Sequence, residues 1–216
     1  MLYGFVLGNL LPDADFFLLG IIYLFDSGLG RAMHRSFTHS ILGILVISAL
    51  VYRFSKGEQE ERWALAAGIG YGMFAHCFAD IFFWFSGIKA FWPVGFFGLP
   101  DSINIWAGLN VPGLVTNILG AMDYLAAALY LLFLTKGAKR PGWLRGMLLV
   151  QWPLFVLFLA LAFFLEKGLF DLVHYAVFIL FLLPAPLYAT VKMRSAIEEL
   201  ALEERGQAQE TSGPSA

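Results

Sequence analysis

Residues 2–25 read L-Y-G-F-V-L-G-N-L-L-P-D-A-D-F-F-L-L-G-I-I-Y-L-F, an apolar run without Lys or Arg. A membrane-spanning helix needs about 20 mostly apolar residues, so this run is long enough to cross a bilayer. It nevertheless contains Asp13 and Asp15, and a charge near the bilayer centre costs roughly 2.5–3.5 kcal/mol on insertion scales. The stretch therefore predicts a membrane protein in which two carboxylates need a compensating partner.

The composition extends this interpretation to the whole chain. Of the 216 residues, 59% are hydrophobic and 14% are charged, whereas a soluble domain carries about 25% charged residues. The net charge of −2 gives no support to nucleic-acid binding. The single cysteine, Cys77, excludes an intrachain disulfide. We expect an all-α, polytopic membrane protein embedded in the lipid bilayer, with no nucleic-acid partner.

Six segments qualify or nearly qualify as transmembrane helices: residues 2–25, 38–54, 63–86, 113–135, 144–165 and 169–191. The second segment is the weakest, because its clean apolar run is short. We expect a metal-site helical domain with an aromatic outer loop over residues 1–112. Residues 113–191 are expected to add transmembrane helices, and residues 192–216 to form a cytoplasmic, partly disordered tail.

Lys and Arg residues predict the orientation, because cytoplasmic loops carry an excess of them. With six spans, one side carries Arg53, Lys56, Arg62, Lys136, Lys139, Arg140, Arg145, Lys192, Arg194 and Arg205. The other side carries only Arg31, Arg35, Lys89 and Lys167. Both termini are therefore expected in the cytoplasm, and this orientation puts all four histidines in the outer half of the membrane.

Three short stretches concentrate the residue types that hold divalent metals. They are P-D-A-D with Asp13 and Asp15, H-R-S-F-T-H-S with His34 and His39, and F-A-H-C-F-A-D with His76 and Asp80. Two divalent cations would neutralise three carboxylates and one hydroxide. We therefore expect an intramembrane metal site, with two ions of Zn²⁺ or Mn²⁺.

Local spacing decides which of these side chains can meet. His76 and Asp80 are spaced i, i+4 and share one helix face; the alternative is a hydrogen bond between them that joins neighbouring helices. Asp13 and Asp15 would diverge on a regular helix, but Pro12 predicts a break that lets both face inward. The alternative there is a proline kink in which Asp15 caps a helix. Ser36 or Thr38 is the expected N-cap of the second span.

Several other polar residues have two interpretations. Arg35 offers a planar fork for phosphate or carboxylate, or it is an interfacial residue that snorkels. Asp123, in the middle of the fourth span, is either functional or hydrogen-bonded between helices. Asp171 and His174 are expected to be an interfacial capping pair, and the alternative is that they are part of the site. Loop 87–112 is an aromatic belt segment, a lid, or both, with Lys89, Asp101 and Asn104 as its polar candidates.

Four motifs together resemble the LexA-regulated, inner-membrane, predicted metal-dependent hydrolases of the YdjM-like family. They are G-N-L-L-P-D-A-D, H-R-S-F-T-H-S, A-H-C-F-A-D and F-W-P, within about residues 1–95. The first two motifs are the specific part of the resemblance. It implies distant kinship with the zinc phospholipase C and P1 nuclease group, and hence phosphoester hydrolysis over a cluster of metals. By position, the implied metal ligands are Asp13, Asp15, His34, His39, His76 and Asp80.

The expected function is metal-dependent hydrolysis of a membrane-embedded phosphoester, a lipid or isoprenoid phosphate, at the cell (inner) membrane. The metals would activate water, Arg35 would hold the phosphate, and Asp15 or Asp80 would act as general base. Two alternatives are an ion- or proton-coupled transporter, since buried Asp and His also mark ion pathways, and a non-catalytic scaffold with a structural metal. The apolar inner halves of the second and third spans favour the enzyme. The metal, the substrate and the oligomeric state are not set by the sequence.

Overall fold

The computed structural model describes residues 1–85, 87–135, 142–200 and 202, and its regular elements are helical, as predicted. Within these residues, the only extended pairing is an isolated antiparallel bridge between Ile88 and Ile103. The α-helices are α1 (Leu2–Leu10), α2 (Phe16–Phe25), α3 (Ser27–His34), α4 (Ile41–Phe54), α5 (Gln59–Phe83), α6 (Gly113–Leu134), α7 (Gly142–Phe164), α8 (Lys167–Val177) and α9 (Pro184–Lys192). The shorter elements are the 3-10 helices η1 (Pro12–Asp15), η2 (Phe37–His39) and η3 (Val94–Phe97) and the π-helical turn η4 (Phe178–Leu182).

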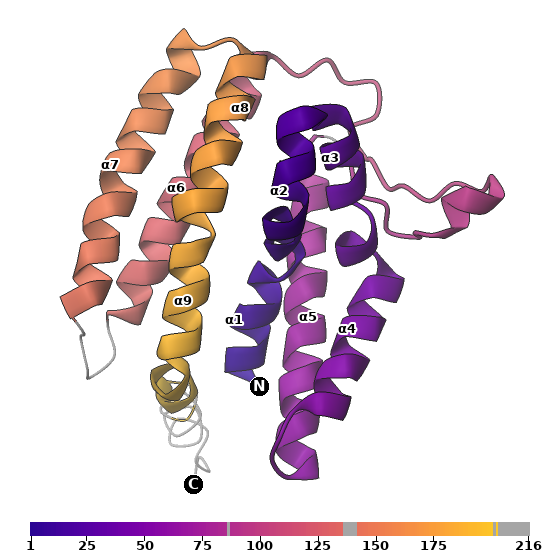
Figure 1. Cartoon of the computed structure of the whole chain (residues 1–216), viewed down its shortest axis with the longest axis vertical. Coiled ribbons are helices and arrows are strands. Elements are labelled where there is room, and N and C mark those ends of the chain that lie inside the picture. Colours follow the sequence, from indigo (N-terminus) through magenta and orange to yellow (C-terminus); the bar gives the residue numbers. More distant parts are fainter. Residues whose placement is uncertain (86, 136–141, 201, 203–216) are drawn as a thin grey trace, which may run out of the picture.

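The helices form two groups that lie side by side (Figure 1). In the first group, α1 to α5, helix α5 packs against both α1 and α4; in the second, α6 to α9, helix α6 packs against α7 and α8. The second group has an apolar core in which Tyr124, Phe158 and Phe170 are fully buried. Phe16 of α2 joins that core, so the two groups are in contact where α2 begins.

Among the residues that the structure describes, four helical stretches are long and apolar enough to cross a membrane. They are α5, α6, α7 and the continuous run Lys167–Lys192 formed by α8, η4 and α9. The predicted helical membrane class is thus confirmed, whereas the count of six spans stays a prediction. Helix α4 has only 14 residues, and residues 2–25 are divided into α1, η1 and α2 at Pro12, which has no N–H to donate to a helix ladder.

Facing glycines bring α1 and α5 into backbone contact. Gly4 and Gly8 on α1, and Gly68 and Gly72 on α5, are each four residues apart, the spacing of small residues that lets membrane helices approach closely. A Cβ added at Gly72 would lie 2.7 Å from the backbone nitrogen of Asn9, nearer than real Cβ contacts allow. This contact holds the end of α1 beside the turn of α5 that precedes His76.

The connection between α5 and α6 leaves the helical groups and carries the short helix η3 (Figure 1). On η3, Phe96 and Phe97 are 78% and 79% exposed, as expected for an aromatic segment at a membrane interface. The start of the connection is attached to the histidine-rich loop, because Lys89 N donates to Arg35 O and Ile41 N donates to Ala90 O.

After a turn at Met193, residues 194–200 are again helical. The part predicted to be disordered, residues 203–216, lies outside the described residues. So do four cations of the orientation count, Lys136, Lys139, Arg140 and Arg205, and the side chain of Arg31. The predicted division of the chain at residues 112 and 191 stays a prediction.

Candidate metal centre

Four elements of the first helical group supply the polar side chains of this site. Asp13 and Asp15 lie on η1, where Pro12 occupies the first position and the helix breaks as predicted. His34 ends α3, His39 ends η2, and His76 and Asp80 lie on α5. The structure therefore brings together the six residues that the sequence singled out as metal ligands.

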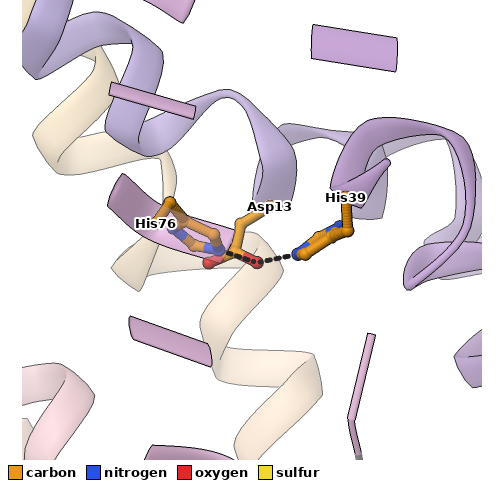
Figure 2. Close-up of side chains that lie close together, drawn as sticks. All are labelled: Asp13, His39 and His76. Atoms are coloured by element: carbon orange, nitrogen blue, oxygen red, sulfur yellow. Dashed lines mark ion pairs between the residues drawn. The ribbon is translucent and has the colours of Figure 1, made fainter. Parts of the chain in front are cut away.

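Asp13 lies at the centre of the group. Its Oδ1 is 3.5 Å from Nε2 of His34, 3.5 Å from Nε2 of His76 and 4.0 Å from Nε2 of His39. Figure 2 shows His39 and His76 approaching this carboxylate from opposite sides. Three imidazoles from three different elements thus point at one carboxylate oxygen, although more than 60 residues separate Asp13 from His76.

Asp80 lies on the other side of the same histidines. Its Oδ2 is 3.3 Å from Nε2 of His39 and 3.7 Å from Nε2 of His76, and its side chain is buried. The i, i+4 spacing on α5 places His76 and Asp80 on one face, as predicted. Both also contact His39 or Asp13 from other elements, so their contact is part of a larger convergence of nitrogen and oxygen atoms.

Asp15 contacts the periphery of this group. Its Oδ1 is 2.6 Å from Nδ1 of His34, and its Oδ2 accepts a hydrogen bond of 2.7 Å from the Thr38 hydroxyl. With Nδ1 engaged by Asp15, the ring of His34 presents Nε2 to Asp13. A carboxylate that holds the far nitrogen of a histidine is the usual outer support of a metal ligand.

The expectation that Ser36 or Thr38 caps the second span is wrong. The N-cap of α4 is Ser40, whose Oγ accepts a hydrogen bond of 2.9 Å from Gly43 N. The Thr38 hydroxyl is engaged by Asp15, 23 residues away in sequence. Consequently His39 lies before α4, on η2, and not in the first turn of the span.

The chemistry of these residues fits a divalent metal. Nε2 of His39 and Nε2 of His76 are buried, and within the described residues neither makes a direct hydrogen bond, although carboxylate oxygens of Asp13 and Asp80 lie 3.3–3.7 Å away. One ligand atom from each of Asp13, His39 and His76 lies within 4.8 Å of the others, and the same holds for Asp15, His34 and His39. Imidazole nitrogen and carboxylate oxygen are ligands that Zn²⁺ and Mn²⁺ accept. The identity of the metal stays a prediction.

A cavity of about 120 Å³ opens beside these ligands, at the boundary between the two helical groups. The first group contributes Asp13, Phe16, His34, Arg35, His76, Asp80 and Trp84 to its lining. Arg35 is held there by a hydrogen bond of 3.0 Å from Nη1 to Gly87 O. The lining does not include the loop candidates Lys89, Asp101 and Asn104.

The second helical group contributes two polar residues whose roles the sequence left open. Asp123 of α6 and His174 of α8 both line the cavity, and His174 Nε2 lies 3.5 Å from Asp123 Oδ2. Asp171, expected with His174 as an interfacial capping pair, forms an ion pair with Lys167 at 2.7 Å. The spacing of His174 in the sequence indicated that it is buried. Phe170, His174 and Phe178 recur every four residues, which places them on one helix face, and all three are buried.

The comparisons with known proteins match the chain to a family. No curated protein matches the chain, and no solved structure does. The kinship with the zinc phospholipase C and P1 nuclease group that the motifs imply thus stays a prediction. The family model that matches is that of the YdjM inner membrane protein, and it covers residues 1–168, which include the six potential metal ligands. The chain therefore belongs to the YdjM inner membrane protein family.

Proposed function

We propose that this protein is a membrane-bound, metal-dependent hydrolase of a membrane-embedded phosphoester, a lipid or isoprenoid phosphate. One observation carries the proposal: Asp13, His39, His76 and Asp80 converge from three elements, and their buried imidazole nitrogens and carboxylate oxygens face one another without direct hydrogen bonds. A structural network would join these nitrogens and oxygens by direct hydrogen bonds. In a site that binds cations, ligand atoms at such separations face the metal and not one another.

Asp13, His34, His39, His76 and Asp80 would hold the ions, which the sequence arguments put at two. Divalent ions bound there would supply activation of water and stabilisation of charge on a phosphoryl oxygen. Asp80 is the better of the two expected general bases, because both oxygens of Asp15 are already engaged by His34 and Thr38. Asp15 then supports His34 from outside the site.

The substrate class follows from the walls of the cavity. Arg35 supplies a guanidinium that suits a phosphate, and its hydrogen bond to Gly87 O holds it at the cavity. The rest of the lining includes Phe16, Trp84 and Phe178. An anionic headgroup with an apolar tail matches this combination better than a free, water-soluble ester does.

The proposal includes a topology in which both termini are cytoplasmic and the site lies in the outer half of the membrane. The arrangement of helices supports it, since α3 lies near the end of the molecule opposite the N-terminus (Figure 1). On a Cys77→Ser background, Glu58→Cys should react with an impermeant thiol reagent only from the cytoplasmic side. Phe97→Cys should react only from the outside, and cytoplasmic labelling of Phe97→Cys would overturn the topology.

The proposed activity is tested with purified protein in detergent, assayed before and after removal and return of Zn²⁺ or Mn²⁺. Phosphatidylcholine, phosphatidic acid and farnesyl phosphate are suitable probes. We expect hydrolysis of at least one of them only with metal, and its loss in Asp80→Asn. A protein that retains its metal and hydrolyses none of them would be a metal-bound scaffold. The matched control is Asp171→Asn, which changes the same group at the Lys167 ion pair.

A further inference from the structure

The second helical group contributes a carboxylate, that of Asp123, to the wall of the cavity. The side chain of Asp123 is 31% exposed, so this carboxylate is open to a molecule that occupies the cavity. Asp123 belongs to neither of the two groups of potential metal ligands found among the described residues. A carboxylate that faces the cavity without being one of these ligands needs another partner.

Aromatic rings fix the histidine that contacts Asp123. Phe170 stacks on His174 with ring centroids 5.8 Å apart and an interplanar angle of 10°, and Tyr124 and Phe158 meet its edge at 5.5 and 5.7 Å. Its Nδ1 is buried and has no hydrogen-bond partner within the described residues. A proton on Nδ1 would be a buried donor without an acceptor, so the ring proton belongs on Nε2.

This tautomer decides what Asp123 offers to the cavity. His174 Nε2 lies 3.5 Å from Asp123 Oδ2, so its N–H faces one carboxylate oxygen and fixes the orientation of the group. In the part of the chain that the structure describes, His174 is the only side chain paired with Asp123. A carboxylate can accept several hydrogen bonds at its two oxygens. Asp123 is therefore a positioned acceptor with capacity left for a donor in the cavity.

The charges around the cavity indicate that this donor is a cation. Two divalent ions would balance Asp13, Asp15, Asp80 and one hydroxide, and Arg35 would balance the single negative charge of a phosphodiester. Asp123 then remains with only an uncharged imidazole beside it. A buried carboxylate without a cationic partner is costly, most of all in a membrane. A substrate that carries its own positive charge supplies that partner.

The cavity also limits the kind of cation. Arg35 and Asp123 line the same space of about 120 Å³, so a phosphate at the first and a cation at the second belong to one short headgroup. A primary ammonium is compact and has N–H groups that donate to a carboxylate. A quaternary ammonium is bulkier and has no N–H. The primary ammonium therefore fits this place better.

We infer that Asp123, oriented by His174, binds the primary ammonium of a zwitterionic phosphoester, an inference that rests on the proposed function. The substrate class is a phospholipid whose headgroup is a short aminoalkyl phosphate. Arg35 binds the phosphate, and the ammonium donates a hydrogen bond to the Asp123 carboxylate. Asp123 thereby sets the specificity and takes no part in making or breaking bonds.

The first test replaces the ammonium by a methyl group of similar size. The paired esters are dihexanoyl phosphatidylethanolamine and dihexanoyl phosphatidylpropanol. The wild type should prefer the first by about tenfold or more in kcat/KM, as a hydrogen bond to a charged group provides. Asp123→Asn should lose most of this preference, through a lower kcat/KM on the ethanolamine ester alone. His174→Gln should lose less of it, and Asp171→Asn, on the same helix as His174, should lose none.

Metal content and the pattern of loss separate the other outcomes. Asp123→Asn should bind as much Zn²⁺ as the wild type, and loss of metal would make Asp123 a ligand and overturn the inference. Equal losses on both esters with metal retained would also overturn it, because a structural role does not depend on the headgroup. A wild type that hydrolyses both esters equally well would overturn it even if a variant fails to fold.

Binding without turnover distinguishes failure of this inference from failure of the proposed function. Isothermal titration of Zn²⁺-loaded protein with aminoethylphosphonate and with propylphosphonate compares the same two groups on molecules that have no ester bond. The wild type should bind aminoethylphosphonate about tenfold more tightly or more, and Asp123→Asn should bind the two alike. If neither ester is hydrolysed but this preference is found, the proposed function fails and the ammonium site stands. Equal binding of the two phosphonates by the wild type would overturn the site itself.

Discussion

The two helical groups meet at one cavity, but they build their sides of it differently. In the first group, Asp13, His34 and His39 lie on or beside short helices that interrupt the longer ones, and glycine contacts hold η1 next to α5. In the second group, Asp123 and His174 lie within the regular helices α6 and α8 and contact each other beside an apolar core. Irregular backbone gathers many ligands at one point, whereas regular helices hold a single pair at a defined position. The first arrangement suits a metal centre and the second suits a group that acts on the substrate.

The largest effect should come from removing a ligand of the first group. His76→Ala deletes the imidazole nitrogen that lies 3.5 Å from Asp13 and 3.7 Å from Asp80. We expect the metal content to fall from about two divalent ions per chain to about one or none, as measured by elemental analysis of purified protein. His174→Gln, in the second group, should keep the wild-type content. Full retention in His76→Ala, or equal loss in both variants, would remove the distinction between the groups.

The next largest effect should come from Arg35, which belongs to the first group but is expected to bind the phosphate of the substrate. Arg35→Lys keeps the charge and loses the fork, and Arg35→Ala loses both. Arg35→Ala should lower kcat/KM roughly tenfold or more, because a hydrogen bond to a charged group contributes about 1.5–3 kcal/mol. Metal content should not change in either variant. Wild-type rates in both would leave Arg35 as an interfacial anchor that is hydrogen-bonded to Gly87.

The glycine contact between α1 and α5 can be broken without touching a polar residue. Gly72→Leu should force the helices apart, because even a Cβ there meets the backbone of Asn9, and overpacking typically costs about 1–3 kcal/mol. The variant should unfold at a lower temperature and bind metal more weakly, since η1 follows α1 directly. Gly146→Leu on α7 is the matched control, because a Cβ at Gly146 meets nothing within 4 Å. Equal metal affinity in the two variants would show that the contact does not position Asp13.

The smallest effect should come from Thr38, which acts through Asp15. Thr38→Val removes a hydrogen bond of 2.7 Å to that carboxylate, worth about 0.5–1.5 kcal/mol. Isothermal titration with Zn²⁺ should show weaker binding by about tenfold, the lower end of what outer partners of metal ligands contribute. Thr116→Val removes a comparable hydrogen bond to Gly113 O in the second group. Its metal affinity should equal that of the wild type.

The contrast between the groups also explains what the sequence could predict. Asp13, His76 and Asp80 were recognisable because polar residues in apolar runs are costly, and Pro12 marked the break between α1 and α2. These signals are local, and the convergence of the six residues followed from assigning their stretches to one side of the membrane.

Other features depended on contacts between distant parts of the chain. The N-cap of α4 was misassigned because Asp15 engages the Thr38 hydroxyl, which leaves the cap to Ser40. His174 could pair with Asp171 on its own helix or with Asp123 on α6, and only the packing of α6 against α8 decides between them. The glycine spacing on α1 and on α5 is typical of helices in close contact. It predicts this contact only once the two helices are known to be neighbours.

The size of the cavity sets what the protein can distinguish among its substrates. At about 120 Å³, the cavity is well below the 300–1,000 Å³ of pockets that enclose whole small ligands, and it corresponds to roughly four water molecules at about 30 Å³ each. A phosphate group with the first carbons of its alcohol fits in that space and a whole hydrocarbon tail does not, so the rest of the tail stays among the lipids. Turnover should therefore be nearly indifferent to chain length and unsaturation, and selectivity should reside in the few atoms around the phosphorus.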